Sequence, residues 1–146
     1  MREILFKAKR IDNGEWVEGW FLKDEVTGQC FIHASGNSVN ESDKVNEEGC
    51  LRFIAFEVDE NTICQYTGLT DKNGNKIWEN DICDRKEKYP EVVKQYQGDW
   101  VLDYSYLFGK NVGYSYCNLG FYACERKCVE VISNIFDNLE LVKGSE

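Results

Sequence analysis

The tetrapeptide Asp71-Lys72-Asn73-Gly74 constrains the fold of this chain more than any other segment. Asp favours the first position of a tight turn, and Gly at the last position accepts backbone angles that other residues avoid. The flanking segments, 62–67 (TICQYT) and 76–84 (KIWENDICD), contain many β-branched and aromatic residues. The pattern predicts a β-hairpin whose turn is formed by Asp71, Asn73 and Gly74.

Further strands are predicted on both sides of this hairpin, because long stretches with apolar residues at helical spacing are hard to find. We expect strands over 4–9, 15–22, 29–33, 51–58, 100–108, 112–117, 120–124 and 129–136. The segment 51–58 leaves a helical alternative open. Asp12-Asn13-Gly14 lies between the first two strands and predicts a second hairpin. The polar, acidic stretch 36–49 predicts a loop.

Short strands at this spacing predict a mainly β fold with little helix, built as a small barrel or roll. At 146 residues the chain is within the size of one domain. We therefore expect a single domain over 1–146, with a β-hairpin and loop region over 1–61 and the barrel core over 62–146. The charged run 84–91 is the best candidate for an excursion from the barrel.

The charge of the chain limits its partners. Lysine and arginine number 17 and aspartate and glutamate 26, which gives a net charge of −9. A field of this sign repels nucleic-acid backbones and anionic membranes. No apolar run approaches the roughly 20 residues of a membrane-spanning helix, and the first residues show no export signal. The seven cysteines are an odd number, so we expect reduced thiols in a cytoplasmic protein.

Residues 65–83 (QYTGLTDKNGNKIWENDIC) resemble the hallmark of the YopX-like family of phage and prophage proteins, which typically runs Q-Y-T-G-L-x-D-K-N-G-K-x-I-x-E-G-D-I-V. The segments 1–19 (MREILFKAKRIDNGEWVEG) and 129–141 (VEVISNIFDNLEL) are similar to the family's usual opening and close. Asn80 replaces the usual Gly and can take the same left-handed turn geometry. The resemblance implies an SH3-like β-barrel with an N-terminal β-hairpin extension, and it implies no reaction, catalytic residue or cofactor.

Some polar residues of the hallmark are not explained by turn geometry. Tyr66 and Glu79 are the clearest of these, and with Gln65 and Asp81 they can form one polar rim. The competing interpretation is that Glu79 and Asp81 accept hydrogen bonds from backbone N–H groups and fix the turn. Adding the aromatic residues after the hairpin gives a candidate interaction surface of Gln65, Tyr66, Glu79, Asp81, Trp100, Tyr104 and Tyr106.

Groupings that suggest catalysis or metal binding are weak. Structural zinc needs four ligands, and Cys117, Cys124 and Cys128 have no fourth ligand nearby in the sequence. The single histidine, His33, cannot face Cys30 squarely on a strand. Acid pairs arise by chance in so acidic a chain; they are Asp99 with Asp103 and Asp81 with Asp84. We therefore assign no catalytic, cofactor-binding or metal-binding residue, and we expect the protein not to be an enzyme.

Nucleic-acid binding has two possible sources in this sequence. The first is the basic cluster Arg2, Lys7, Lys9 and Arg10, which can equally protect the edge of a sheet. The second is a series of aromatic side chains on which bases can stack; these are Tyr96, Trp100, Tyr104, Tyr106, Phe108, Tyr114, Tyr116, Phe121 and Tyr122. The surrounding segment is neutral, so aromatic packing and interfaces explain the series better.

Three functions follow from these observations. The first is a non-enzymatic module that binds a protein partner or assembles into a homo-oligomer, because Trp and Tyr are enriched at binding hot spots. The second is a nucleic-acid-binding or DNA-mimicking accessory protein. The third is a small metal-dependent hydrolase, which has the weakest support.

Overall fold

The computed structural model describes residues 3–34, 54–109 and 115–143. The chain forms two compact units, residues 1–65 and 66–146, which we call the N-terminal and C-terminal units. All strand pairings that the structure describes are antiparallel, and the predicted mainly β fold is confirmed. The single domain, with its division after residue 61, stays a prediction. The loop expected over 36–49 lies outside the described residues.

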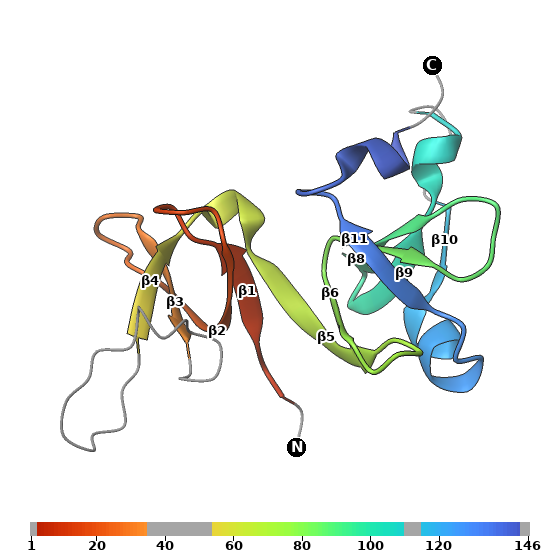
Figure 1. Ribbon diagram of the computed structural model, residues 1–146, viewed down its shortest axis with the longest axis horizontal. Helices are drawn as coiled ribbons and strands as arrows, with labels where there is room; N and C mark the ends of the chain where they lie inside the picture. Colours follow the sequence, from red (N-terminus) through yellow and green to blue (C-terminus); the bar gives the residue numbers. More distant parts are fainter. Residues whose placement is uncertain (1–2, 35–53, 110–114, 144–146) are drawn as a thin grey trace. The chain divides into compact units, whose positions relative to one another are not determined.

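In its described residues, the N-terminal unit contains four complete strands, one short helix and the beginning of a fifth strand; the strands are labelled in Figure 1. The elements are β1 (Phe6–Lys9), β2 (Trp16–Lys23), β3 (Cys30–Ala34), β4 (Ile54–Val58), the 3-10 helix η3 (Glu60–Thr62) and β5 (Cys64–Thr70). The strands follow the order β4-β3-β2-β1-β5. The strands predicted over 4–9, 15–22 and 29–33 are confirmed, and so is the part of 51–58 that the structure describes, while residues 51–53 lie outside the described residues. The N-terminal part is therefore a sheet rather than one hairpin.

Gly19 is the point at which β2 changes partners. It pairs with Phe6 of β1 and also with Ala34 of β3. A Cβ atom at Gly19 would lie 2.1 Å from the backbone oxygen of His33, so only glycine fits this close approach. β1 also meets β4: Arg10, directly after the end of β1, forms an antiparallel bridge with Val58 of β4.

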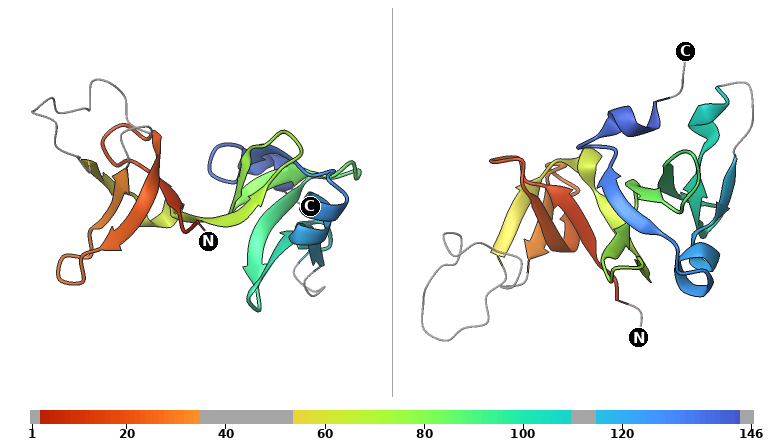
Figure 2. Two further views of the ribbon diagram at one scale, coloured as in Figure 1. Left: turned by 90° about the horizontal axis from the view of Figure 1, so that it is seen from below. Right: turned by 45° about the vertical axis from the view of Figure 1, so that its right-hand side comes forward.

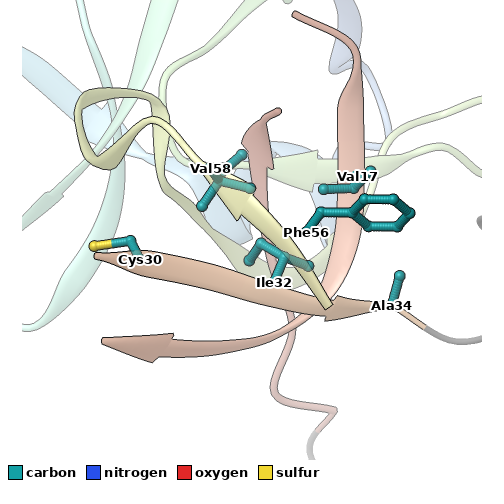
Figure 3. Close-up of a cluster of buried hydrophobic side chains, with 7 residues drawn as sticks. Val17, Cys30, Ile32, Ala34, Phe56 and Val58 are labelled. Atoms are coloured by element: carbon teal, nitrogen blue, oxygen red, sulfur yellow. The ribbon is translucent and has the colours of Figure 1, made fainter. Parts of the chain in front are cut away.

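The core of the N-terminal unit is apolar and receives a side chain from every complete strand. Its buried members are Ala8, Val17, Cys30, Ile32, Ala34, Phe56 and Val58. Figure 3 shows alternate residues of β3 on the side where Phe56 and Val58 lie. This alternation is the period-two pattern of a strand with one buried face.

Over residues 66–109 and 115–143, the C-terminal unit continues from β5 with six strands and three short helical segments. They are β6 (Lys76–Trp78), β7 (Asp81–Asp84), β8 (Glu91–Tyr96), β9 (Asp99–Asp103), η4 (Ser105–Leu107), β10 (Tyr116–Asn118), the π-helical η5 (Phe121–Glu125), β11 (Glu130–Asn134) and η6 (Leu139–Val142). β5 and β6 form the predicted hairpin, and five strands form a sheet in the order β10-β9-β8-β7-β11. The expected barrel over 62–146 is not closed in the described residues, since β10 and β11 lie at opposite ends of this order.

The five-stranded sheet buries side chains on both faces. On one face Val93 and Leu102, which are direct cross-strand partners, belong to the larger apolar cluster. On the other face Ile82 and Val92 form a small cluster with Val142 of η6. The second cluster has fewer buried residues than the first, and a cavity described below lies beside it.

The boundary between the two units lies inside β5 (Figures 1 and 2). Cys64 and Gln65 pair with β1 in the N-terminal unit. Tyr66 and Thr70 pair with β6 in the C-terminal unit. One strand therefore belongs to both units, without a linker between them.

Two expected strands of the C-terminal unit are wrong in part or entirely. The strand expected over 100–108 ends at Asp103, and the next residues form η4. The strand expected over 120–124 is the helical segment η5. Its first turn is fixed by Asn118, whose Oδ1 accepts a hydrogen bond from the N–H of Phe121 at 2.8 Å. A polar side chain outside the segment thus decides its conformation, against the β propensity of its aromatic residues.

Two further differences concern the segment between the hairpin and β9. The strand expected over 76–84 is divided into β6 and β7, because Asn80 has a φ of 69° and turns the chain between them. The charged run 84–91 ends in the first residue of β8, a strand that we did not predict. This residue, Glu91, is fully buried, so a charged residue begins a strand of the core.

Candidate functional site

Asp71 connects the hairpin turn to the closing strand of the same unit. Its Oδ1 accepts hydrogen bonds from the N–H groups of Asn73 and Asn75, both at 2.9 Å. Its Oδ2 accepts a hydrogen bond from the N–H of Val131 in β11 at 3.0 Å. Gly74, at a φ of 84°, completes the turn by donating its N–H to the Asp71 carbonyl. The side chain therefore supports a local turn and a contact 60 residues away.

The electrostatics of Asp71 follow from these bonds. Burial raises the pKa of the Asp71 carboxyl, but the N–H groups of Val131, Asn75 and Asn73 outweigh burial, so the pKa lies below its ordinary value of 3.8. Lys72 adds a second connection to the same strand, with its ammonium 3.2 Å from a carboxylate oxygen of Glu130. These groups give the turn a clear architectural role.

Asn80 and Asp81 fix the second turn of the hallmark segment. The Oδ2 of Asp81, a buried residue, accepts a hydrogen bond from the N–H of Trp78 at 2.8 Å. The backbone of Asn80 donates to the Val93 carbonyl and accepts from the N–H of Ile135. The interpretation in which Asp81 fixes the turn therefore has direct geometric support.

The seven residues of the candidate interaction surface lie in different environments. Tyr66 is buried, and its ring lies 5.4 Å from that of Trp78. Gln65 pairs with Phe6 in the N-terminal unit, whereas the other six residues belong to the C-terminal unit. Glu79 is half-buried. The predicted polar rim of Gln65, Tyr66, Glu79 and Asp81 is therefore not exposed as a whole, because Tyr66 and Asp81 are buried.

The other three aromatic members of the set, Trp100, Tyr104 and Tyr106, are half-buried. Trp100 packs against the larger apolar cluster of the C-terminal unit. Tyr104 lies between two other rings, with its centroid 5.5 Å from that of Tyr89 and 6.4 Å from that of Phe108. Tyr106 donates its hydroxyl to the Pro90 carbonyl at 2.7 Å, and burial raises its pKa. Packing therefore accounts for much of their surface.

Arg85 and Glu91 form a buried ion pair that the sequence analysis did not predict. The Nε of Arg85 lies 2.5 Å from the Oε1 of Glu91, and the guanidinium also stacks on the ring of Tyr122 at 4.5 Å. Burial raises the pKa of Glu91, and Arg85 opposes that shift. The spacing of six residues across the turn between β7 and β8 is the sequence signal that could have suggested this pair.

Cys117 contacts the same ion pair from β10. Its Sγ lies 3.5 Å from the Oε2 of Glu91. Burial, and then the Glu91 carboxylate, raise the pKa of the Cys117 thiol to about 12. A thiol with this pKa is protonated near neutral pH and is a poor nucleophile.

The groupings considered for metal binding do not come together. Within the described ranges no three Cys, His, Asp or Glu side chains are placed to hold one metal ion. The Sγ of Cys128 lies 3.8 Å from the carbonyl oxygen of Tyr122, whereas that of Cys117 faces Glu91. The six cysteines that the structure describes are all free thiols.

The basic residues of β1 are not at the edge of a sheet, so the edge interpretation is wrong. Lys7 pairs with Glu18 of β2 on one side and with Cys64 of β5 on the other. The Nζ atoms of Lys7 and Lys9 lie 4.6 Å and 5.4 Å from the ring centroid of Trp16. Cation–π contacts with this ring therefore engage both ammonium groups.

The aromatic series that we considered as an alternative stacking platform for bases is divided among separate ring pairs. Tyr96 contacts Tyr116, with centroids 5.0 Å apart, and Phe121 contacts Tyr122 at 5.1 Å. Tyr114 lies outside the described residues. The first pair is tilted and the second is edge-to-face, so these rings pack against each other and do not form one continuous platform.

An apolar group on the outer face of the N-terminal sheet was not predicted. Trp20 is 60% exposed and Leu22 is 55% exposed, two residues apart on β2. Trp20 pairs directly with His33 of β3, and Leu22 pairs with Phe31. Direct cross-strand partners share a face, so these four residues lie together, and we call them the Trp20 face. The sequence does carry a signal for the Trp20 face. Trp20 and Leu22 alternate with the buried positions Val17 and Gly19, so they point to the opposite side of the strand.

The fold and these contacts define an antiparallel β protein in which carboxylates fix the turns. The chain belongs to the YopX protein family, whose model matches residues 6–143. The crystal structure of protein EF1440 from Enterococcus faecalis is similar, with a TM-score of 0.53 and 21% identity over 98% of this chain and 100% of that one. At this identity the likeness shows the fold alone. No match was found among the curated proteins. Among the described residues, no helix has the length and apolar character needed to cross a membrane.

Proposed function

We propose that this protein is a non-enzymatic interaction module of phage or prophage origin, acting in the host bacterial cytoplasm. In this role the Trp20 face binds a protein partner or a second copy of the chain. The observation that carries the proposal is the exposure of Trp20 and Leu22 side by side on one sheet face. Large apolar side chains grouped on a surface are typical of protein interfaces, and Trp is enriched at their energetic centres.

The shape of the Trp20 face supports an interface. A paired sheet holds the backbone under each side chain, since Trp20 and Leu22 both have direct partners in β3. Ordered aromatic and aliphatic groups lose little further entropy on binding. Phe31 and His33, both half-buried, extend the face across the neighbouring strand.

The alternatives have less support. An enzyme with a cysteine nucleophile is not favoured at Cys117, which contacts the Arg85–Glu91 pair, because its thiol pKa is raised to about 12. For nucleic-acid binding, Lys7 and Lys9 lie over the Trp16 ring, and the net charge of −9 opposes phosphate contacts. Neither observation favours a second candidate over the interaction module.

The test replaces Trp20 and Leu22 by Ser in one variant. Sedimentation velocity over a range of protein concentrations measures self-association, and affinity capture from host cells measures binding of other proteins. We expect the double variant to lose the association or the captured partner of the wild-type protein by about tenfold or more, because hot-spot residues dominate binding energy.

The matched control is Ile132→Ser, since Ile132 is 46% exposed on β11 of the other unit. This variant should keep wild-type association, and circular dichroism should show that both variants fold. A wild-type protein that stays monomeric at all concentrations and captures nothing that depends on Trp20 and Leu22 contradicts the proposal.

A further inference from the structure

A cavity of about 410 Å³ lies in the C-terminal unit, on the sheet face that carries the smaller apolar cluster. Its apolar wall consists of Val92, Tyr106, Ile135, Leu139 and Val142. The volume falls within the range of small-molecule sites, which extends from about 300 to 1,000 Å³. The cavity is therefore large enough for a ligand rather than for one or two water molecules.

The cavity exists because few large side chains cover this face. The buried cluster here contains only Ile82, Val92 and Val142 among the described residues, with Tyr106 and Ile135 packed beside it. The short helix η6 supplies Leu139 and Val142 on the far side. Apolar side chains thus surround a space that they do not fill.

Among the described residues, two charged side chains line the same cavity, Lys94 and Asp103. Asp103 is 4% exposed and lies directly opposite Val92 in the sheet. Its Oδ1 accepts hydrogen bonds from the N–H and the hydroxyl of Ser105, at 2.7 Å and 2.6 Å, which fixes the orientation of the carboxylate. Its Oδ2 lies 3.9 Å from the Nζ of Lys94, which is longer than a hydrogen bond.

These positions leave an acceptor and a cation beside an apolar space. A carboxylate accepts about four hydrogen bonds, and Ser105 uses only the Oδ1 side of Asp103. Lys94 is half-exposed, so its ammonium can move toward a second partner without breaking a short bond. A ligand that offers both an ammonium and a carboxylate beside an apolar group matches all three features.

We infer that this cavity binds an apolar α-amino acid as a zwitterion. The ammonium group donates hydrogen bonds to the Oδ2 of Asp103, and the ligand carboxylate pairs with the Lys94 ammonium. The side chain of the ligand occupies the space between Val92, Ile135 and Leu139. This binding site lies in the C-terminal unit and does not depend on the function proposed for the Trp20 face.

The experiment titrates the full chain, labelled with ¹⁵N, with L-leucine and L-phenylalanine and follows the amide signals. We expect saturable shifts at the amides of Val92, Asp103 and Ser105. N-acetyl-L-leucine lacks the ammonium and L-leucinamide lacks the carboxylate, so each should bind about tenfold more weakly than L-leucine. These comparisons use the wild-type protein, so they do not depend on the stability of a variant.

Substitutions then test the two head-group contacts. Asp103→Asn keeps an acceptor for Ser105 but removes the charge, and it should weaken L-leucine binding about tenfold. Lys94→Met should weaken L-leucine and leave the binding of L-leucinamide unchanged, because the amide offers no charge to Lys94. The matched controls are Asp99→Asn and Lys88→Met, exposed residues outside the cavity, which should bind L-leucine as the wild-type protein does.

Three results would overturn the inference. The first is the absence of saturable shifts at the cavity with both amino acids at concentrations of several millimolar. The second is equal binding of L-leucine and N-acetyl-L-leucine. The third is an Asp103→Asn variant that is folded, as its amide spectrum shows, and binds L-leucine with unchanged affinity.

Discussion

The two units bury different kinds of side chains. In the described part of the N-terminal unit the buried polar residues are Arg10 and Thr62, and the core is otherwise apolar. In the described part of the C-terminal unit four acids are buried, and they are Asp71, Asp81, Glu91 and Asp103. Each of these acids accepts hydrogen bonds from a neighbouring group or pairs with a cation.

This difference shows two ways in which short strands form a stable unit. Apolar packing stabilises the N-terminal sheet and requires close fit between backbones. In the C-terminal unit the carboxylates of Asp71, Asp81 and Asp103 accept hydrogen bonds from backbone N–H groups at turns, whereas Glu91 is buried against Arg85. The first unit should therefore respond to changes of shape, and the second to changes of charge.

The largest effect is expected from Gly19→Ala in the N-terminal unit. The added Cβ would lie 2.1 Å from the His33 carbonyl oxygen, so β2 and β3 must separate. We expect the free energy of unfolding of this unit to fall by roughly 4 kcal/mol, at the upper end of single-residue effects. Urea unfolding and amide hydrogen exchange measure the loss.

The control for this change is Gly120→Ala in the C-terminal unit. Gly120 has a φ of −58° and its Cβ would meet only the side-chain oxygen of Asn118, at 3.3 Å. It should change stability by less than about 1 kcal/mol. Equal effects of the two substitutions would contradict the close-fit interpretation of the N-terminal sheet.

A smaller but still large effect is expected from Arg85→Met in the C-terminal unit. The change leaves the fully buried Glu91 carboxylate without its ion-pair partner. We expect a loss of about 3 kcal/mol, because breaking a buried pair is more costly than its net contribution. A double-mutant cycle with Glu91→Gln, measured by urea unfolding, should show strong coupling between the two residues.

The exposed ion pair of the N-terminal unit gives the comparison. Lys23 and Glu60 lie 2.8 Å apart, with 39% and 58% of their side chains exposed. The cycle of Lys23→Met and Glu60→Gln should give a much weaker coupling than the cycle of Arg85 and Glu91, because solvent screens an exposed pair. If the two cycles give the same coupling, burial does not explain the difference between the units.

The smallest effect is expected from Asp71→Asn, and it should depend on pH. The folded pKa of Asp71 is below 3.8, so its stabilisation is present at higher pH and is lost as pH falls through 3.8 toward the folded pKa. We expect the variant to be about 1.5 kcal/mol less stable near pH 7 and as stable as the wild-type protein below both pKa values. Urea unfolding at a series of pH values measures this difference.

Glu91 changes the pH dependence in the opposite direction. Its folded pKa is above 4.5, so its ionisation disfavours the folded state as pH rises. Comparing Asp71→Asn with the wild-type protein at each pH cancels this contribution. Asp99→Asn, at an exposed position, should follow the wild-type curve throughout. A stability difference for Asp71→Asn that is the same at every pH would contradict the charged role of Asp71.

The sequence predicted the elements whose signals are local. Asp71 and Gly74 indicate a turn by their own backbone and side-chain preferences, and the structure has that turn. The β8 strand was missed because its first residue is Glu91, whose burial depends on Arg85 across the β7–β8 turn. The helical η5 was mistaken for a strand for a different reason: its aromatic residues favour strands, and the local helix signal is the single side chain of Asn118, which caps the N–H of Phe121. Contacts between separate segments are not encoded in the periodicity of either one.

The candidate site was predicted less well than the fold, for a related reason. Polarity suggested that Asp81 lies on a surface, but its carboxylate is buried against the Trp78 N–H. The Trp20 face required knowing which strands lie beside β2. The cavity lined by Asp103 could not be predicted either, because Leu139 and Val142, which lie much later in the sequence, line it together with residues of β8 and β9.

The strand shared by both units has a consequence for how the polypeptide matures during synthesis. The ladder of β1 is incomplete until Cys64 and Gln65 pair with it. A nascent chain cannot complete its first sheet until those residues have left the ribosome, and by then the next hairpin has begun to emerge. Expression fragments divided after residue 61 should therefore keep the pairing of β1 with β2 but lack its pairing with β5, whereas fragments that extend through residue 65 retain both.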